Sequence, residues 1–190
     1  MDNILAFAPG LAPARPGAGI DCQLTGDFTA RSGLAFRVRP VSIEDKPALS
    51  AFFGRLTPED LRYRFLTAIR EVSHERLTEM IAVDHDWTEN FVALDVEGGE
   101  IIASAMLAAD AKRERGEVAI AIRSDLKRQG IGTLLMGHVC RYAEYLDITC
   151  LESIASRDNC ALIELERRLG FTSRAVQGDP GLLLLQRKLG

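Results

Sequence analysis

The chain has 190 residues, a length that suits one well-buried domain and is too short for two. Of these residues 47% are hydrophobic and 26% are charged, which is typical of globular proteins. Its formal net charge of −4 argues against a nucleic-acid partner, which needs a concentrated positive surface. No apolar run reaches the roughly 20 residues that span a bilayer. The four cysteines form no CxxC pair, which favours reduced thiols. We expect a cytoplasmic protein without a nucleic-acid or membrane partner that works as a monomer or homodimer.

Residues 1–33 are expected to form a flexible N-terminal arm. The stretch MDNILAFAPGLAPARPGAGI is apolar, but it lacks the basic start of a signal peptide and carries Asp2. Pro9, Pro13 and Pro16 interrupt it together with several glycines, so it cannot build a core of its own. We therefore place the folded domain at residues 34–190.

The hydrophobic pattern of this domain alternates between the period of strands and that of helices. Ser42 with Asp45 resembles a capping box, although Pro47 lies beyond the first helical position, and Thr57 followed by Pro58 is a typical helix start. The pattern predicts an α/β fold: a mixed, mostly antiparallel sheet of six to seven strands with helices on both faces. The expected elements are strand 34–41, helices 42–56, 57–68 and 73–83, strands 90–97, 100–110 and 117–123, helix 130–146, strand 148–156, helix 159–171 and strands 171–177 and 181–189.

The stretch DLKRQGIGTLLMGHV (125–139) joins the strand EVAIAI to the helix that follows it. A helix start leaves four backbone N–H groups unpaired and carries about half a positive charge, and glycines there let a ligand approach the backbone. These properties suit a phosphate group. The phosphate seat would be built by Gly130, Ile131, Gly132 and Thr133, with Lys127 and Arg128 adding positive charge.

Three interpretations compete for this stretch. A plain helix start with small residues for packing needs no ligand. The dinucleotide fingerprint GxGxxG begins directly after its strand, but here residues 123–129 intervene and Leu135 stands where the third glycine belongs. The P-loop pattern GxxxxGK[ST] is absent. The third interpretation is a pyrophosphate seat reached across a charged loop.

Two blocks of the sequence support the third interpretation by resemblance. LKRQGIGTLLM resembles the acyl-CoA signature of the GNAT-type N-acetyltransferases, and NCALIELERRLGF resembles a helix that follows it in that family. Both blocks have the family's order and separation, and the resemblance covers about residues 34–189. It is strongest to the acetyltransferase domain of bacterial protein lysine acetyltransferases, to which LTPEDLRYRFLTAIREVSHERLTEMIAVDHD is also similar. The resemblance implies a GNAT-like fold and acetyl-CoA as cosubstrate.

The resemblance also implies a set of acetyl-CoA contacts. In the family, the strand before the loop parts from its neighbour, and the pantetheine arm of CoA lies along its backbone N–H and C=O groups. The second block contributes Asn159, which could instead simply cap its helix. The implied cofactor-binding residues are Ile120, Ala121 and Ile122 for the arm, Lys127, Arg128, Gln129, Gly130, Ile131, Gly132 and Thr133 for the pyrophosphate, and Asn159.

Glu117 is the candidate catalytic residue. The reaction needs a neutral amine, and a general base reduces the cost of deprotonating it. Glu117 opens the strand that should hold CoA, and it matches the glutamate of the lysine acetyltransferases. From the residues alone, a solvated strand-end carboxylate paired with Arg113 or Arg115 is the favoured interpretation. The resemblance favours the catalytic one, with the amine attacking acetyl-CoA directly in a ternary complex.

Two positions depart from the family pattern. Lys127 stands where Gln or Arg is usual, so it offers charge without a guanidinium fork. Glu166 stands where many members carry a tyrosine that protonates the leaving thiolate, so that role is unassigned; Tyr142 and Tyr145 lie on the preceding helix, without a reason to place either at the sulfur.

The acceptor is expected to be a protein lysine, by the same resemblance. A small-molecule amine is the first alternative, and a non-catalytic acyl-CoA-binding regulatory module is an alternative of another class. The stretch LRYRF reads as a helix with a solvated basic edge, but the resemblance places it near the acceptor entrance, where Arg62 or Arg64 would face an acidic substrate. No metal site is predicted, because the histidines are scattered and HERLT is not HExxH.

Overall fold

The computed structural model describes residues 24–190. These residues form a mixed eight-stranded sheet in the order β1-β2-β3-β4-β5-β6-β8-β7. Every neighbouring pair is antiparallel except β5 and β6. The strands are β1 (Gly26–Thr29), β2 (Ala35–Pro40), β3 (Thr88–Asp95), β4 (Ile101–Ala109), β5 (Arg115–Ile122), β6 (Cys150–Ser156), β7 (Thr172–Val176) and β8 (Asp179–Lys188).

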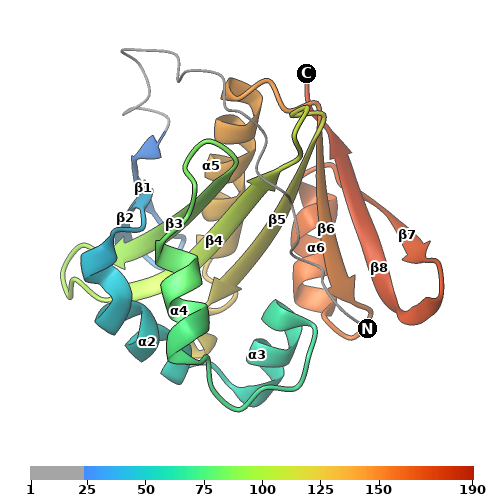
Figure 1. The fold of residues 1–190 in the computed structure, drawn as a ribbon. Helices are drawn as coiled ribbons and strands as arrows, with labels where there is room; N and C mark the ends of the chain where they lie inside the picture. Colours follow the sequence, from blue (N-terminus) through green and yellow to red (C-terminus); the bar gives the residue numbers. More distant parts are fainter. Residues whose placement is uncertain (1–23) are drawn as a thin grey trace.

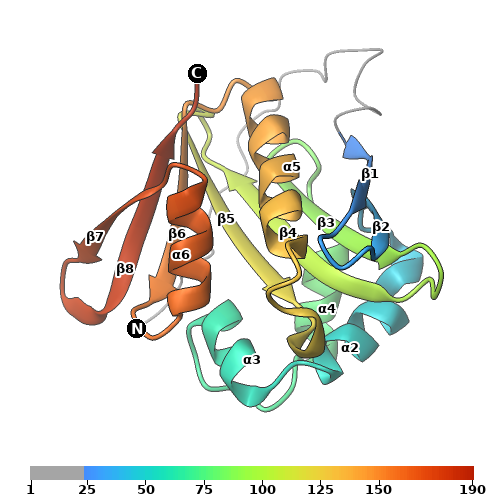
Figure 2. The same ribbon diagram turned by 180° about the vertical axis from the view of Figure 1, so that it is seen from behind.

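Helices cover both faces of the sheet, as Figures 1 and 2 show from opposite sides. On one face lie α2 (Lys46–Gly54), α3 (Pro58–Phe65) and α4 (His74–Ile81), and on the other lie α5 (Ile131–Tyr145) and α6 (Cys160–Arg168). The expected α/β class, with its mostly antiparallel sheet between helices, is confirmed. Among the helices in the described part of the chain, none is long and apolar enough to cross a bilayer.

Each face of the sheet has its own hydrophobic core. Leu135, Met136 and Val139 of α5 are fully buried against one face, since they recur at helical spacing. On the other face, α2 and α4 pack a second cluster that includes Leu49 and Leu77. Burial on both sides fixes the central strands β3, β4 and β5, which carry the site described below.

The helix starts follow the residues expected to cap them. Thr57 accepts a hydrogen bond from the backbone N–H of Asp60 (3.2 Å) at the start of α3. Ser42 and Asp45 do form a capping box, but it opens a short 3₁₀ turn at Ile43–Asp45. The α-helix α2 begins at Lys46, so Pro47 occupies its second position, where it has no intrahelical N–H bond to lose.

The sheet begins earlier than expected, and the boundary at Gly33 is wrong. Strand β1 lies inside the range 1–33 assigned to a flexible arm, and it adds an eighth strand to the six or seven expected. Phe28 stacks on Phe36 of β2 with ring centroids 5.5 Å apart, and this packing holds the short strand at the edge. Four residues with one large apolar side chain give too weak a pattern to predict. Residues 1–23 of the expected arm lie outside the described residues.

Candidate active site

Strands β5 and β6 separate partway along their length. They pair only from Arg115 opposite Cys150 to Glu117 opposite Glu152. Beyond that point β5 stays paired with β4 as far as Ile122, while β6 stays paired with β8. The two strands therefore diverge into a wedge, which is visible between them in Figures 1 and 2.

The wedge leaves one edge of β5 without a strand partner. The N–H of Arg123 donates to the carbonyl oxygen of Ile102 beside β4 (2.9 Å). Because successive residues of a strand direct their backbone groups to opposite edges, the N–H and C=O groups of Ile120 and Ile122 point toward the wedge. An extended ligand can form strand-like hydrogen bonds with such an edge.

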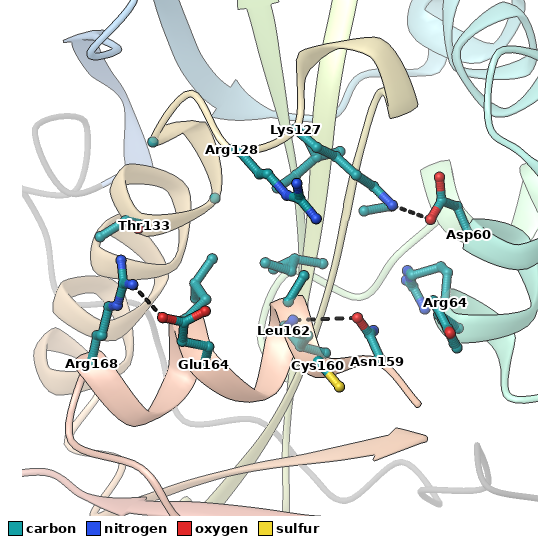
Figure 3. A pocket seen from close by; sticks show the side chains of 18 of the residues that line it. Asp60, Arg64, Lys127, Arg128, Thr133, Asn159, Cys160, Leu162, Glu164 and Arg168 are labelled. Atoms are coloured by element: carbon teal, nitrogen blue, oxygen red, sulfur yellow. Dashed lines mark hydrogen bonds and ion pairs between the residues drawn. The ribbon is translucent and has the colours of Figure 1, made fainter. Parts of the chain in front are cut away.

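A cavity of about 690 Å³ opens at this wedge (Figure 3). Helix α3, the open edge of β5, the loop before α5 and the start of α6 contribute its walls. Most of the expected cofactor-binding residues line it: Ile120, Ala121, Ile122, Lys127, Arg128, Gly130, Gly132, Thr133 and Asn159. The structure thus brings together two blocks of sequence that were recognised separately.

Two of the expected residues do not line the cavity with their side chains. Ile131 is 1% exposed and packs in the core beneath α5, because the first turn of an amphipathic helix must also bury an apolar side. Gln129 uses its carbonyl oxygen to accept a hydrogen bond from the N–H of Arg31 (2.9 Å). Any role of these two residues toward a phosphate would therefore fall to their backbone N–H groups.

Glycines shape the loop that precedes α5. Gly130 is the N-cap and has a φ of 95°, in the left-handed region that favours glycine. A Cβ on Gly132 would lie 2.6 Å from Cδ1 of Ile122 and 2.7 Å from Cδ1 of Leu165, so the ends of both side chains would have to shift to admit a larger residue between β5 and α6. The loop also holds Arg128 at a φ of 64°, which a non-glycine residue adopts only at some cost. These features suit a helix start that a phosphate group can approach closely.

Positive side chains line the cavity near the loop before α5. Lys127 forms an ion pair with Asp60 of α3, and Arg168 forms one with Glu164 within α6. Arg31 and Arg128 also line the cavity. Arg31 lies in the stretch that the sequence analysis assigned to the arm, so its contribution was missed; its proximity to the loop depends on the unexpected strand β1.

Asn159 caps helix α6. Its Oδ1 accepts a hydrogen bond from the backbone N–H of Leu162 (3.3 Å), as drawn in Figure 3. Its side chain also lines the cavity. The capping interpretation is confirmed, and the expected contact with CoA stays a prediction.

Glu117 occupies the last paired position of β5 before the wedge. It is half-buried, and burial raises the pKa of its carboxyl group, with the charge of Arg64 opposing this shift and that of Glu152 adding to it. Its side chain does not line the cavity itself. Arg115 instead pairs with Glu152, and Arg113 lies over the Trp87 ring at 5.5 Å. The alternative of a strand-end ion pair between Glu117 and either arginine is therefore wrong.

Glu166 is fully buried between α6 and the sheet. Both of its carboxylate oxygens lie within hydrogen-bond distance of the Ser153 hydroxyl of β6 (2.7 and 2.6 Å). Burial raises the pKa of this carboxyl group to about 7, although the Ser153 hydrogen bond works in the other direction. Glu166 does not line the cavity, so the structure assigns it no contact with a leaving thiolate.

Comparison with known proteins identifies this arrangement. The family model described as the acetyltransferase (GNAT) family matches residues 58–171. The chain is 31% identical over 145 residues to the acetyltransferase PA5475 of Pseudomonas aeruginosa, covering 75% of this chain and 76% of that protein. The chain therefore belongs to the GNAT family and is an acetyl-CoA-dependent acetyltransferase.

Two further relatives carry the name Pat. Acetyltransferase Pat of Mycolicibacterium smegmatis is 29% identical over 159 residues, which is 82% of this chain but only 46% of that protein. The chain thus spans about half the length of that relative. The GNAT domain of S. lividans PAT has the same fold, with a TM-score of 0.81 at 22% identity, covering 87% of this chain and 97% of that domain.

Proposed function

We propose that this enzyme acetylates the ε-amine of protein lysines by direct transfer from bound acetyl-CoA, with Glu117 as the general base. The position of Glu117 carries the proposal. It lies at the apex of the wedge, where a cosubstrate arm along Ile120 and Ile122 would end. It is half-buried and held in no ion pair within residues 24–190, so it is available to a reacting amine.

A base is needed because lysine is almost entirely protonated at neutral pH. Its ordinary pKa near 10.4 leaves about one amine in two thousand neutral at pH 7, equivalent to roughly 4.6 kcal/mol. A carboxylate whose pKa is raised by burial is a stronger base than a solvated one. Glu117 has this property while the nearby charge of Arg64 limits the rise of its pKa.

The chemical step is a simple exchange of bonds. Glu117 accepts a proton from the lysine ammonium, the neutral nitrogen attacks the thioester carbonyl and the C–N bond forms. The attacking nitrogen then loses a second proton to solvent as the C–S bond breaks, which leaves the neutral amide. CoA leaves as a thiolate, which is a tolerable leaving group without an acid. Backbone N–H groups on the open edge of β5 would polarise the carbonyl oxygen. The N–H groups of Gly130 to Thr133 would hold the diphosphate, with Arg128 beside them.

The resemblance of the sequence to the acetyltransferase domain of bacterial protein lysine acetyltransferases supports lysine as the acceptor. The fold of the S. lividans PAT domain extends over almost all of the described chain. We also propose that the enzyme works in the cytoplasm as a monomer or homodimer without a nucleic-acid partner, which the net charge of −4 and the free thiols of Cys140, Cys150 and Cys160 support.

Release of free CoA thiol from acetyl-CoA tests the proposal. We expect release with lysine-bearing proteins and incorporation of labelled acetyl groups at lysine. Release with small amines alone would favour a metabolic enzyme, and CoA binding without release would favour a regulatory module.

Glu117→Gln should keep CoA affinity and lose turnover at pH 7. Glu152→Gln, which removes the neighbouring carboxylate engaged with Arg115, is the matched control; equal activity of both variants would remove Glu117 from the mechanism.

A further inference from the structure

Arg64 is a half-buried cation at the α3 wall of the cavity. It lies near the end of α3, and Figure 3 shows it beside Asp60, across the cavity from α6. Its Nε is buried and has no hydrogen-bond partner. Within residues 24–190, its guanidinium takes part in no ion pair. Its Cζ lies 5.1 Å from the centroid of the neighbouring Phe65 ring.

Three acidic groups near Arg64 are engaged with other residues. Asp60 pairs with Lys127, and Glu59 accepts a hydrogen bond from the Tyr63 hydroxyl (3.1 Å). On the opposite wall, Asp158 lies 3.7 Å from the exposed Arg62. These three acids already have partners, whereas Glu117, whose charge also acts on Arg64, takes part in no ion pair in the described part of the chain.

The charges that act on Arg64 come from Glu117 and Arg76. Glu117 favours its protonated form, and Arg76 of α4 opposes it. Burial lowers the pKa of Arg64 to about 10, so the guanidinium stays charged at neutral pH. A partly buried charge without an ion-pair partner carries a desolvation cost, and such a cost is typical of groups at functional sites.

We propose that Arg64 binds a carboxylate of the acceptor, so that the preferred substrate is a lysine flanked by an acidic residue. A guanidinium fork matches a carboxylate with two parallel hydrogen bonds. The location favours the acceptor over CoA, because the phosphate seat lies at the start of α5 whereas Arg64 lies on α3 within the electrostatic reach of Glu117. This inference rests on the proposed lysine acetylation and names its substrate class.

A pair of peptides tests the proposal. One carries lysine flanked by glutamate, and the other carries glutamine at the same positions. We expect wild-type kcat/KM to be about 10- to 100-fold higher for the glutamate peptide, the range for a charged hydrogen-bonded pair. Arg64→Gln should abolish this preference. Arg62→Gln removes an exposed charge from the same helix and should retain it.

The ratio of kcat/KM for the glutamate peptide to kcat/KM for the glutamine peptide separates carboxylate binding from other roles of Arg64. If Arg64 only adjusts Glu117 or supports the fold, its variant slows both peptides equally and the ratio persists, which would overturn the proposal. Equal rates of the wild type on both peptides would also overturn it. The variant should fold with unchanged CoA affinity and no loss of melting temperature, since it removes a partly buried unpaired charge.

A second substrate pair distinguishes failure of this inference from failure of the proposed function. If the wild type acetylates neither peptide, protein lysine is the wrong acceptor. The pair 6-aminohexanoate and 6-aminohexanamide then decides the role of Arg64. A preference for the carboxylate that disappears in Arg64→Gln supports carboxylate binding, and its absence overturns it.

Discussion

Lys127 and Asp60 form an ion pair that joins the loop before α5 to helix α3 across the cavity wall. Asp60 also accepts a hydrogen bond from the Ser124 hydroxyl (2.5 Å). Although burial alone would raise the pKa of Asp60, the hydrogen bonds from Lys127 and Ser124 hold it below its ordinary value. The pair thus connects the wall that carries Arg64 to the loop expected to hold the diphosphate, and it engages the Lys127 ammonium.

This pair predicts that Lys127 mainly stabilises the fold, whereas its neighbour Arg128 mainly binds CoA. Lys127→Gln should weaken CoA binding less than threefold, but it should lower the free energy of unfolding by about 1–3 kcal/mol because Asp60 loses its charged partner. Arg128→Gln should weaken CoA binding about tenfold with little loss of stability. Calorimetric titration with CoA and urea unfolding measure both quantities. An affinity loss in Lys127→Gln as large as that in Arg128→Gln would contradict this assignment.

Gly132 predicts a steric effect on the same site. Gly132→Ala should lower the free energy of unfolding by about 1–3 kcal/mol and weaken CoA binding, because its Cβ would displace Ile122 and Leu165. Gly137→Ala is the matched control on the same helix. Its Cβ meets only Arg141 Nη1 at 3.7 Å, so it should stabilise α5 by about 0.5–1 kcal/mol. Equal behaviour of the two variants in thermal unfolding and CoA titration would show that Gly132 is not a packing constraint.

Glu117 predicts a distinctive pH dependence of the rate. A carboxylate acts as a base only above its pKa, and burial raises the pKa of Glu117 above the ordinary 4.5. Wild-type kcat/KM should therefore rise through that pKa and level off below the lysine pKa. Glu117→Gln depends on amine that is already neutral, so its rate should rise about tenfold for each pH unit up to the lysine pKa near 10.4. Parallel profiles of the two enzymes between pH 6 and 9 would contradict the assignment.

Glu166 predicts a loss of stability as pH rises. Its pKa is raised to about 7 in the folded protein against about 4.5 unfolded, so its contribution is fully present below pH 4.5 and is lost as the pH rises through about 7. Glu166→Gln keeps a neutral side chain at all pH values. The variant should therefore gain about 3 kcal/mol relative to wild type between pH 4.5 and pH 8, as measured by urea unfolding. A constant difference across this range would show that Glu166 is ionised in the folded state.

Local signals predicted much of the fold and half of the site. The order of helices and strands followed from hydrophobic periodicity, and the glycines before α5 marked the helix start correctly. Strand β1 was missed because its four residues are held by Phe28 packing on Phe36, a contact that no periodicity encodes. Ile131 was assigned to a ligand although its side chain completes the core, since a motif names positions without distinguishing backbone from side chain.

The remaining half of the site depends on contacts between distant residues. Lys127 and Asp60 are 67 positions apart, and their pairing requires the whole β-sheet between them. The sequence offered Arg62 and Arg64 as equivalent candidates near an acceptor. Only the packing of α3 distinguishes them, because it buries the Nε of Arg64 at the cavity and leaves Arg62 exposed.

A crystal structure of the protein with bound CoA tests the central claim most directly. The account predicts the diphosphate on the N–H groups of Gly130 to Thr133 and the pantetheine arm hydrogen-bonded to the backbone of Ile120 and Ile122, with its sulfur near Glu117. CoA bound elsewhere, or a wedge filled by the protein's own side chains while CoA has no measurable affinity in solution, would contradict it.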